Sequence, residues 1–275
     1  MTVLDWSARP AERLTINGVA LEYACYGPAP EQAPTIVMLH EGLGSVSQWK
    51  DFPAEVARQS GQGVFVYSRQ GYGNSDPVNR PRPLDFMTRE ATSVLPALLD
   101  RIGFKSGILL GHSDGATIAS IYAGSVEDHR IRGLILIAPH FFTEPIGLAE
   151  IARAKQAFET GDLKQRLSRH HTDEDGAFLG WADAWLDPGF ADWNVSDSID
   201  YLRIPALVVQ GREDQYGTLA QVSEIETRSY APVDTLILDD CRHAPHQDRP
   251  GDVLNAVGEF VARLERIEAA TVETV

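Results

Sequence analysis

The sequence has 275 residues, 43% apolar and 23% charged, which is the composition of an ordinary globular protein with room for one large domain or two small ones. Its 24 Lys and Arg residues against 39 Asp and Glu residues give a formal net charge of −15. Duplex nucleic acid and anionic membrane surfaces both require basic patches, so this balance argues against either as a partner.

The chain carries no predicted export or membrane signal. Its first residues, MTVLDWSARP, lack the apolar core of a signal peptide, and no apolar stretch approaches the ~18–20 residues of a membrane-spanning helix. The two cysteines, Cys25 and Cys241, are too few for a disulfide framework and favour a reduced state, although one bridge between them is left open. We therefore expect a soluble, cytoplasmic protein.

The first predicted element is a β-hairpin, because RLTINGVALEYACYG contains two strand-like runs joined by Asn17-Gly18, and both residues tolerate positive φ. Short apolar runs then alternate with helix-like stretches. The predicted strands are 35–39, 64–67, 108–110, 134–137, 207–209 and 235–238. The predicted helices are about 47–59, 86–102, 115–124, 219–228 and 252–268. Strands that are apolar throughout are buried on both faces, so the pattern predicts an α/β fold with a doubly wound, mostly parallel, eight-stranded sheet.

The stretch 140–203 interrupts this alternation, since its 64 residues separate two predicted strands. It contains several helix-like pieces and three of the five tryptophans. Ligands bind at the carboxyl ends of the strands in open α/β sheets, so we interpret it as a helical cap inserted over that edge. The alternative is a structural helical layer packed by its own aromatic side chains. The predicted division is a core domain of 1–139 and 204–275 and a cap of 140–203.

The strongest chemical motif is Gly-His-Ser-Asp-Gly at 111–115, which follows a predicted buried strand and opens a predicted helix. In this setting a G-x-S-x-G pattern forms a sharp turn that exposes the central residue, and the flanking glycines avoid clashes. Two potential nucleophiles stand side by side, Ser113 and Asp114. The glycine spacing selects Ser113, whose hydroxyl would lie at a helix N-terminus that favours developing negative charge.

With this motif, nearly the whole chain resembles the α/β-hydrolase superfamily. That resemblance implies a triad in the chain order serine, acid, histidine. The resemblance assigns Asp214, in VVQGREDQYG, as the acid, and the neighbouring Glu213 is a weaker candidate. It assigns His243, in CRHAPHQDRP, as the base, and His246 is the alternative. Imidazole titrates in the range needed to activate a serine hydroxyl, and a buried carboxylate fixes its tautomer.

An oxyanion hole needs two backbone N–H donors. The resemblance implies that one belongs to Asp114 and the other to the loop MLHEGLGSVSQW. Relatives usually have His-Gly there, whereas this sequence inserts Glu41 between His40 and Gly42. Alignment on GLGS makes Leu43 the second donor, which we favour, and alignment on the histidine makes it Gly42.

The acidic side chains of Asp114 and Glu41 are unusual beside an oxyanion hole. A carboxylate at the first residue of a helix is favoured by the helix dipole by about 0.3–1 kcal/mol, which would suffice to explain Asp114. We expect its side chain to point away from the oxyanion. A second interpretation is a polar shell of Asp114 and Glu41 with Arg69 or His140 as partners. The predicted substrate pocket contains Glu41, Gly42, His140, Phe141, Phe142, Trp181 and Trp185.

The resemblance implies a serine hydrolase that cleaves an ester, thioester or lactone of a small or medium acyl group through an acyl-enzyme. Two alternatives are left open, a hydrolase of C–C bonds in ring-fission products and a non-catalytic small-molecule receptor. Enzymes of the superfamily with an Asp nucleophile are disfavoured because position 113 is Ser. No phosphate-binding glycine loop or helical metal-binding His pattern occurs, so we expect no cofactor and no metal. The expected partner is a small-molecule substrate, and a homodimer is left open.

Overall fold

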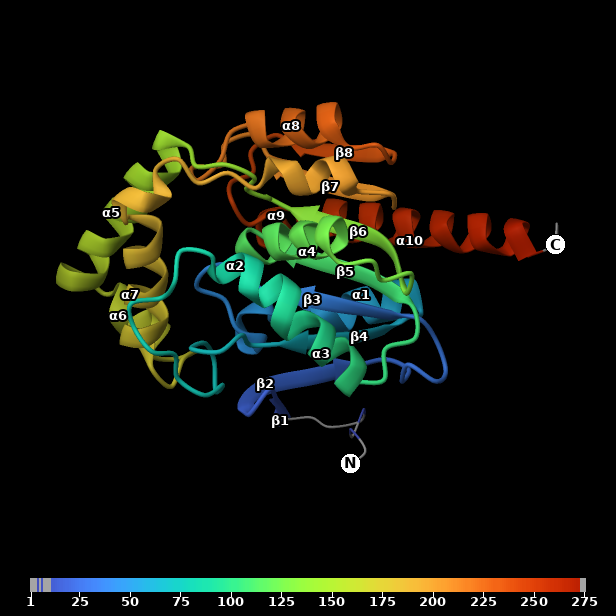
Figure 1. Ribbon diagram of the computed structural model, residues 1–275, viewed down its shortest axis with the longest axis horizontal. Helices are drawn as coiled ribbons and strands as arrows, with labels where there is room; N and C mark the ends of the chain where they lie inside the picture. Colours follow the sequence, from blue (N-terminus) through green and yellow to red (C-terminus); the bar gives the residue numbers. More distant parts are fainter. Residues whose placement is uncertain (1–3, 5, 7–10, 273–275) are drawn as a thin grey trace.

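The computed structural model describes residues 4, 6 and 11–272, and its sheet has the strand order β1-β2-β4-β3-β5-β6-β7-β8 (Figure 1). The strands are β1 (Glu12–Ile16), β2 (Val19–Tyr26), β3 (Thr35–Leu39), β4 (Gly63–Tyr67), β5 (Gly107–His112), β6 (Ile131–Ile137), β7 (Ala206–Gly211) and β8 (Val233–Leu238). β2 is antiparallel to β1 and β4, and the pairs from β4 across to β8 are parallel. The predicted eight-stranded, mostly parallel α/β sheet is confirmed.

Helices cover both faces of the sheet, and each face has its own hydrophobic cluster. On one face α1 (Phe52–Ser60) contacts the long α10 (Pro250–Val272). The other face is covered by α2 (Phe86–Arg89), α3 (Leu95–Arg101), α4 (Asp114–Ser125) and α8 (Ala220–Arg228). The short α9 (Pro245–Asp248) leads from β8 into α10.

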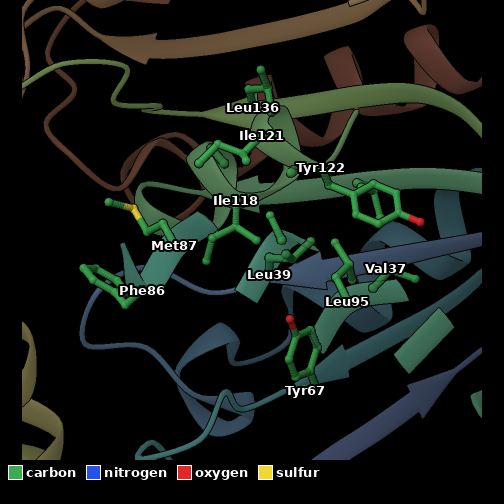
Figure 2. Close-up of a cluster of buried hydrophobic side chains, with 14 of the residues drawn as sticks. Val37, Leu39, Tyr67, Phe86, Met87, Leu95, Ile118, Ile121, Tyr122 and Leu136 are labelled. Atoms are coloured by element: carbon green, nitrogen blue, oxygen red, sulfur yellow. The ribbon is translucent and has the colours of Figure 1, made fainter. Parts of the chain in front are cut away.

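The helix α4 lies at the centre of its layer and is buried on all sides. Figure 2 shows Ile118 of this helix beside Leu39 of β3, and Ile121 on the side of Leu136 of β6. Small residues on its remaining faces allow the neighbouring elements to approach closely. Because packing holds α4 in place, the turn at its N-terminus is held rigidly as well.

Prolines interrupt the regular α-helical geometry of two of the predicted helices. The predicted helix 47–59 is a 3₁₀ turn, η1 (Val46–Trp49), followed by α1 with Pro53 at its second position. The predicted helix 86–102 is continuous, but a π-helical turn, η2 (Glu90–Val94), joins α2 to α3 just before Pro96. A proline ring has no N–H to donate and collides with the carbonyl four residues earlier, so a regular α-helix cannot continue through either position.

The segment between β6 and β7 forms α5 (Pro145–Thr160), α6 (Leu163–Leu167), α7 (Glu174–Trp185) and the 3₁₀ turns η3 (Pro188–Phe190) and η4 (Ser196–Tyr201). Figure 1 shows α5, α6 and α7 together beside the sheet. They lie at the carboxyl ends of the strands, because α5 and α7 line the same cavity as residues that follow β3, β5, β6, β7 and β8. Aromatic side chains also pack within this insertion, with Phe158 stacked on Phe178 at 4.1 Å.

Two further sequence expectations concern the whole chain. No disulfide joins Cys25 on β2 to Cys241, which follows β8 at the far edge of the sheet. Among the helices of the described residues, none combines the length and the apolar character needed to cross a membrane.

Candidate active site

Ser113 occupies the turn between β5 and α4 in a strained conformation. Its φ is 53° and its ψ is −120°, a region that residues other than glycine rarely adopt. A Cβ at Gly111 would collide with the backbone of Gly115, and a Cβ at Gly115 would collide with the carbonyl oxygen of Leu39. The two glycines of the motif are therefore required by close backbone approach, as the spacing predicts.

The structure brings Ser113, His243 and Asp214 together from three separate loops. The Ser113 Oγ lies 3.0 Å from His243 Nε2, and His243 Nδ1 lies 2.8 and 2.9 Å from the two carboxylate oxygens of Asp214. The carboxylate also accepts hydrogen bonds from the Tyr216 N–H at 2.8 Å and from Gln210 Nε2 at 2.7 Å. A carboxylate can only accept, so Nδ1 donates to Asp214 and leaves Nε2 free to accept the serine proton.

Electrostatics favour this arrangement. Burial alone would raise the pKa of Asp214, but the neighbouring His243 and the hydrogen bonds to the carboxylate outweigh burial and hold this pKa at about 2. Asp214 is therefore ionised at neutral pH and can stabilise a positive charge on His243.

The two rival residues of the sequence lie elsewhere. The Glu213 carboxylate accepts a hydrogen bond from the Cys241 N–H at 3.0 Å. The His246 ring is buried against Trp49 and Phe52, with ring centroids 5.0 and 5.3 Å apart. Burial lowers the pKa of His246 well below its usual value. Neither rival takes part in the Ser113–His243–Asp214 arrangement.

Backbone donors line the cavity beside Ser113. The N–H groups of Gly42, Leu43 and Asp114 donate no hydrogen bond to any residue that the structure describes, and all three residues line the same cavity. This leaves them free to bind an oxyanion. The choice of Leu43 over Gly42 as the partner of Asp114 stays a prediction.

A buried guanidinium, that of Arg69 after β4, links the two sides of this predicted oxyanion hole. It donates to the carbonyl oxygens of His40 and Glu41, the latter at 3.0 Å, and its Nη2 lies 3.9 Å from Asp114 Oδ2. Burial raises the pKa of Asp114, and the charge of Arg69 partly opposes that rise. Of the two partners considered for Asp114, Arg69 is the one that the structure places beside its carboxylate. The Glu41 carboxylate instead faces His112.

The cavity above Ser113 has a volume of about 350 Å³. Of the predicted pocket residues, all but Phe141 line it. The prediction for Phe141 is wrong, because this side chain has no exposed surface and packs in the core, with its N–H bonded to Gln221 at 2.7 Å. Leu148 and Ile151 of α5 also line the cavity although they were not among the predicted pocket residues, and their spacing of three places them on one helix face. Tyr216 is a further lining residue that was not predicted, and its ring centroid lies 4.7 Å from that of His243.

The loop that carries Gly42 touches the insertion. A Cβ on Gly42 would collide with the indole of Trp181 on α7. Replacing Gly42 by Ala is therefore expected to push the loop or the indole aside and to lower kcat by about 100-fold, since misplacement by about 1 Å has that effect. Steady-state kinetics measure this. The second-site change Trp181→Leu, which removes the colliding ring, should restore part of the loss, and a full loss in the double variant would contradict this account.

Comparison with known proteins identifies the class. The model of the α/β hydrolase family matches residues 36–257, so the chain belongs to this family. It is 30% identical to serine hydrolase BPHL of Homo sapiens over 211 residues, which cover 74% of this chain and 69% of that protein. It is 24% identical to proline iminopeptidase of Lactobacillus delbrueckii subsp. bulgaricus over 226 residues, covering 68% of this chain and 76% of that protein.

Solved structures show the same fold at lower identity. A carboxylesterase study of the Thaumarchaeon Nitrososphaera gargenis provides a structure with a TM-score of 0.75 and 16% identity, covering 94% of this chain and 99% of that one. The enol-lactonase from Burkholderia xenovorans LB400 has a TM-score of 0.72 and 20% identity, with 91% and 100% covered. Proline iminopeptidase of Mycobacterium smegmatis has a TM-score of 0.70 and 16% identity, with 94% and 99% covered.

Proposed function

We propose that this α/β hydrolase is a serine hydrolase that cleaves an ester, thioester or lactone of a small or medium acyl group through an acyl-enzyme on Ser113. One observation carries the proposal. The Ser113 Oγ lies 3.0 Å from His243 Nε2, whose other ring nitrogen is hydrogen-bonded to Asp214, and this pair faces a cavity lined by N–H groups that bond to no described residue. These are the parts that acyl transfer needs, namely an activated nucleophile and preorganised donors.

The proposed reaction uses these groups in turn. His243 Nε2 takes the proton of Ser113 while Oγ attacks the substrate carbonyl carbon, and the N–H groups of Leu43 and Asp114 bind the resulting oxyanion. The imidazolium then gives its proton to the leaving oxygen or sulfur as the bond to the carbonyl carbon breaks. A water molecule attacks the acyl-enzyme, with His243 again taking and returning one proton. The acid is released and the Ser113 hydroxyl is regenerated.

The walls of the cavity support a small or medium, largely apolar acyl group. Its volume lies at the lower end of the ~300–1,000 Å³ that ligand pockets commonly have. The insertion supplies apolar walls, with Leu148 and Ile151 from α5 and Trp181 and Trp185 from α7. We therefore propose that 140–203 acts as a cap that shapes the acyl site.

His140 is a polar residue in the wall of this largely apolar cavity. Its ring is buried, lines the cavity and makes no hydrogen bond within the described residues. Burial and the neighbouring His243 lower the pKa of His140 to about 3, so the ring is neutral. A neutral imidazole suits a hydroxyl or carbonyl substituent on the acyl group.

A pair of substrates that differ by one hydroxyl tests this role. We expect the wild-type chain to favour a 3-hydroxybutyrate ester over the matching butyrate ester by about fivefold in kcat/KM, the value of one neutral hydrogen bond. His140→Phe should abolish this preference while the butyrate ester is still cleaved. An equal loss for both esters would mean that His140 supports the structure only.

A second candidate function is hydrolysis of an amide next to a free amine, which is suggested by the proline iminopeptidase names of the relatives. One observation favours it. The Glu144 carboxylate lines the cavity and accepts hydrogen bonds from the Thr218 N–H, the Thr218 hydroxyl and Gln221 at 2.6–2.9 Å. No Lys or Arg of the described residues forms an ion pair with it, so a substrate ammonium could supply the positive charge.

A covalent serine probe tests the proposal. Incubation of the wild-type chain with a fluorophosphonate should add one label, located on Ser113 by peptide mass mapping. A folded chain that stays unlabelled would refute the serine-hydrolase proposal in favour of a binding protein. Initial rates on esters, thioesters, lactones and a proline anilide then separate the two candidates, and fastest cleavage of the anilide would favour the second.

A further inference from the structure

His112, the residue before the nucleophile, joins the loops on either side of Ser113. Its Nε2 lies 2.7 Å from the backbone carbonyl oxygen of His243, and its Nδ1 lies 3.4 Å from Glu41 Oε2. The His112 ring is buried, whereas the Glu41 side chain keeps 23% of its surface exposed. Glu41 follows β3 and His243 follows β8, so one imidazole connects the oxyanion loop, the nucleophile turn and the loop of the base.

These contacts determine which ring nitrogens carry protons. A carbonyl oxygen cannot donate, so Nε2 of His112 must carry a proton and donate to His243. If Nδ1 carried none, its lone pair would face a carboxylate, which is repulsive. A proton on Nδ1 turns the same contact into an attraction. The geometry therefore favours a His112 imidazolium paired with a Glu41 carboxylate.

The surroundings agree with this pair of charges. Burial lowers the pKa of His112, but the Glu41 carboxylate 3.4 Å away outweighs burial, and the net shift is upward. Burial raises the pKa of Glu41, but His112 outweighs burial and the net shift is strongly downward. The titratable groups around His112 are Glu41 from the oxyanion loop, His140 after β6, Asp214 from the loop after β7, and His243 and His246 after β8.

We propose that Glu41 and His112 are positioning residues that together form a second carboxylate–imidazole pair, which holds the His243 loop and the oxyanion loop in register with Ser113. The pair is neutral as a whole. The imidazolium therefore also cancels the charge that Glu41 would otherwise place beside a developing oxyanion. This inference rests on the proposed serine-hydrolase function.

A double-mutant cycle tests whether Glu41 acts through His112. The variants are Glu41→Gln, His112→Gln and the pair combined, assayed on the best ester of the panel. Glutamine at 112 can still donate an N–H toward the His243 carbonyl but carries no charge. We expect Glu41→Gln to lower kcat about tenfold, with KM changed less than about twofold, because the alignment that the pair provides affects the transition state more than substrate binding. In the His112→Gln background, the same change should cause no further loss.

A matched control is available at the exposed pair of Glu127 and His129, which are 3.7 Å apart. Glu127→Gln makes the same chemical change and should leave kcat at the wild-type value. The pH profile gives a further readout. Without the carboxylate, His112 should lose its proton at lower pH, so the alkaline limb of kcat in Glu41→Gln should move to lower pH.

Three results would overturn the inference: an equal loss from Glu41→Gln in both backgrounds, a loss confined to KM, or wild-type kcat in His112→Phe. Melting temperatures show whether each variant is folded, and fluorophosphonate labelling shows whether Ser113 is still reactive. Together they distinguish these results from unfolding or loss of the nucleophile. Labelling of the wild type alone reports on the proposed function, whereas the cycle reports on Glu41 and His112.

Discussion

Ser113→Ala is expected to lower kcat by about 10⁶-fold, because a triad that acts as a unit loses nearly all of its effect when the nucleophile is removed. The substituted residue keeps a Cβ and the same left-handed backbone, so only the hydrogen bond to His243 Nε2 is removed from the folded state. The melting temperature should therefore change little. Steady-state turnover of the best ester and labelling by the fluorophosphonate both measure the effect.

The matched control for this prediction is Ser120→Ala. Ser120 is a second buried serine, which lies within α4, and its hydroxyl has no hydrogen-bond partner among the described residues. We expect Ser120→Ala to be labelled and to turn over substrate like the wild type. Comparable turnover by Ser113→Ala and the wild type would contradict the assignment of the nucleophile.

Asp214→Asn is expected to lower kcat by about 10⁴-fold, because an amide stabilises the wrong tautomer of His243 and cannot balance its positive charge. The local geometry adds to the effect. Tyr216 N–H and Gln210 Nε2 both donate to the carboxylate, so an amide NH₂ at 214 would face either a donor or the ring nitrogen of His243. Kinetics across pH measure this change. The pKa of Asp214 is about 2 in the folded chain, so the wild-type carboxylate stays charged throughout the neutral and mildly acidic range.

Glu213→Gln is the control for the acid. It alters the neighbouring carboxylate, which the sequence left as a weaker candidate, and a glutamine oxygen can still accept the Cys241 N–H. Activity should stay within about twofold of the wild type, as for most substitutions outside a site. If Glu213→Gln were the more damaging of the two changes, Asp214 would not be the acid.

Most of the fold could be predicted from local patterns in the sequence. The Asn17-Gly18 turn forms with φ values of 50° and 84°, because both residues suit the left-handed region and the flanking runs alternate. Apolar strands identified the parallel sheet because burial on both faces leaves few polar positions. The irregular turns near Pro53 and Pro96 could also have been predicted, because both prolines are visible in the sequence. The apolar periodicity of the two stretches instead suggested regular helices.

A candidate site residue could be predicted from the sequence where a local motif constrains its position. A contact between side chains from distant loops could not. Ser113 sits in a pattern that backbone sterics dictate. The partner of Glu41 could not be read from the sequence, because His112 lies 71 positions away and meets it only through the order of β3 and β5 in the sheet. Phe141 was misassigned because the loop after β6 buries its side chain in the core, whereas Phe142, which forms an isolated bridge with Asn194, lines the cavity.

The contact between Trp181 and Gly42 has a consequence for redesign of the enzyme. Trp181 lines the cavity that we propose as the acyl site, and it is also the side chain that limits the space of the loop that carries Gly42. A library that varies α7 to admit larger acyl groups will therefore alter turnover together with selectivity. Variants chosen for a new substrate should then need compensating changes at 41–44 before their rates recover.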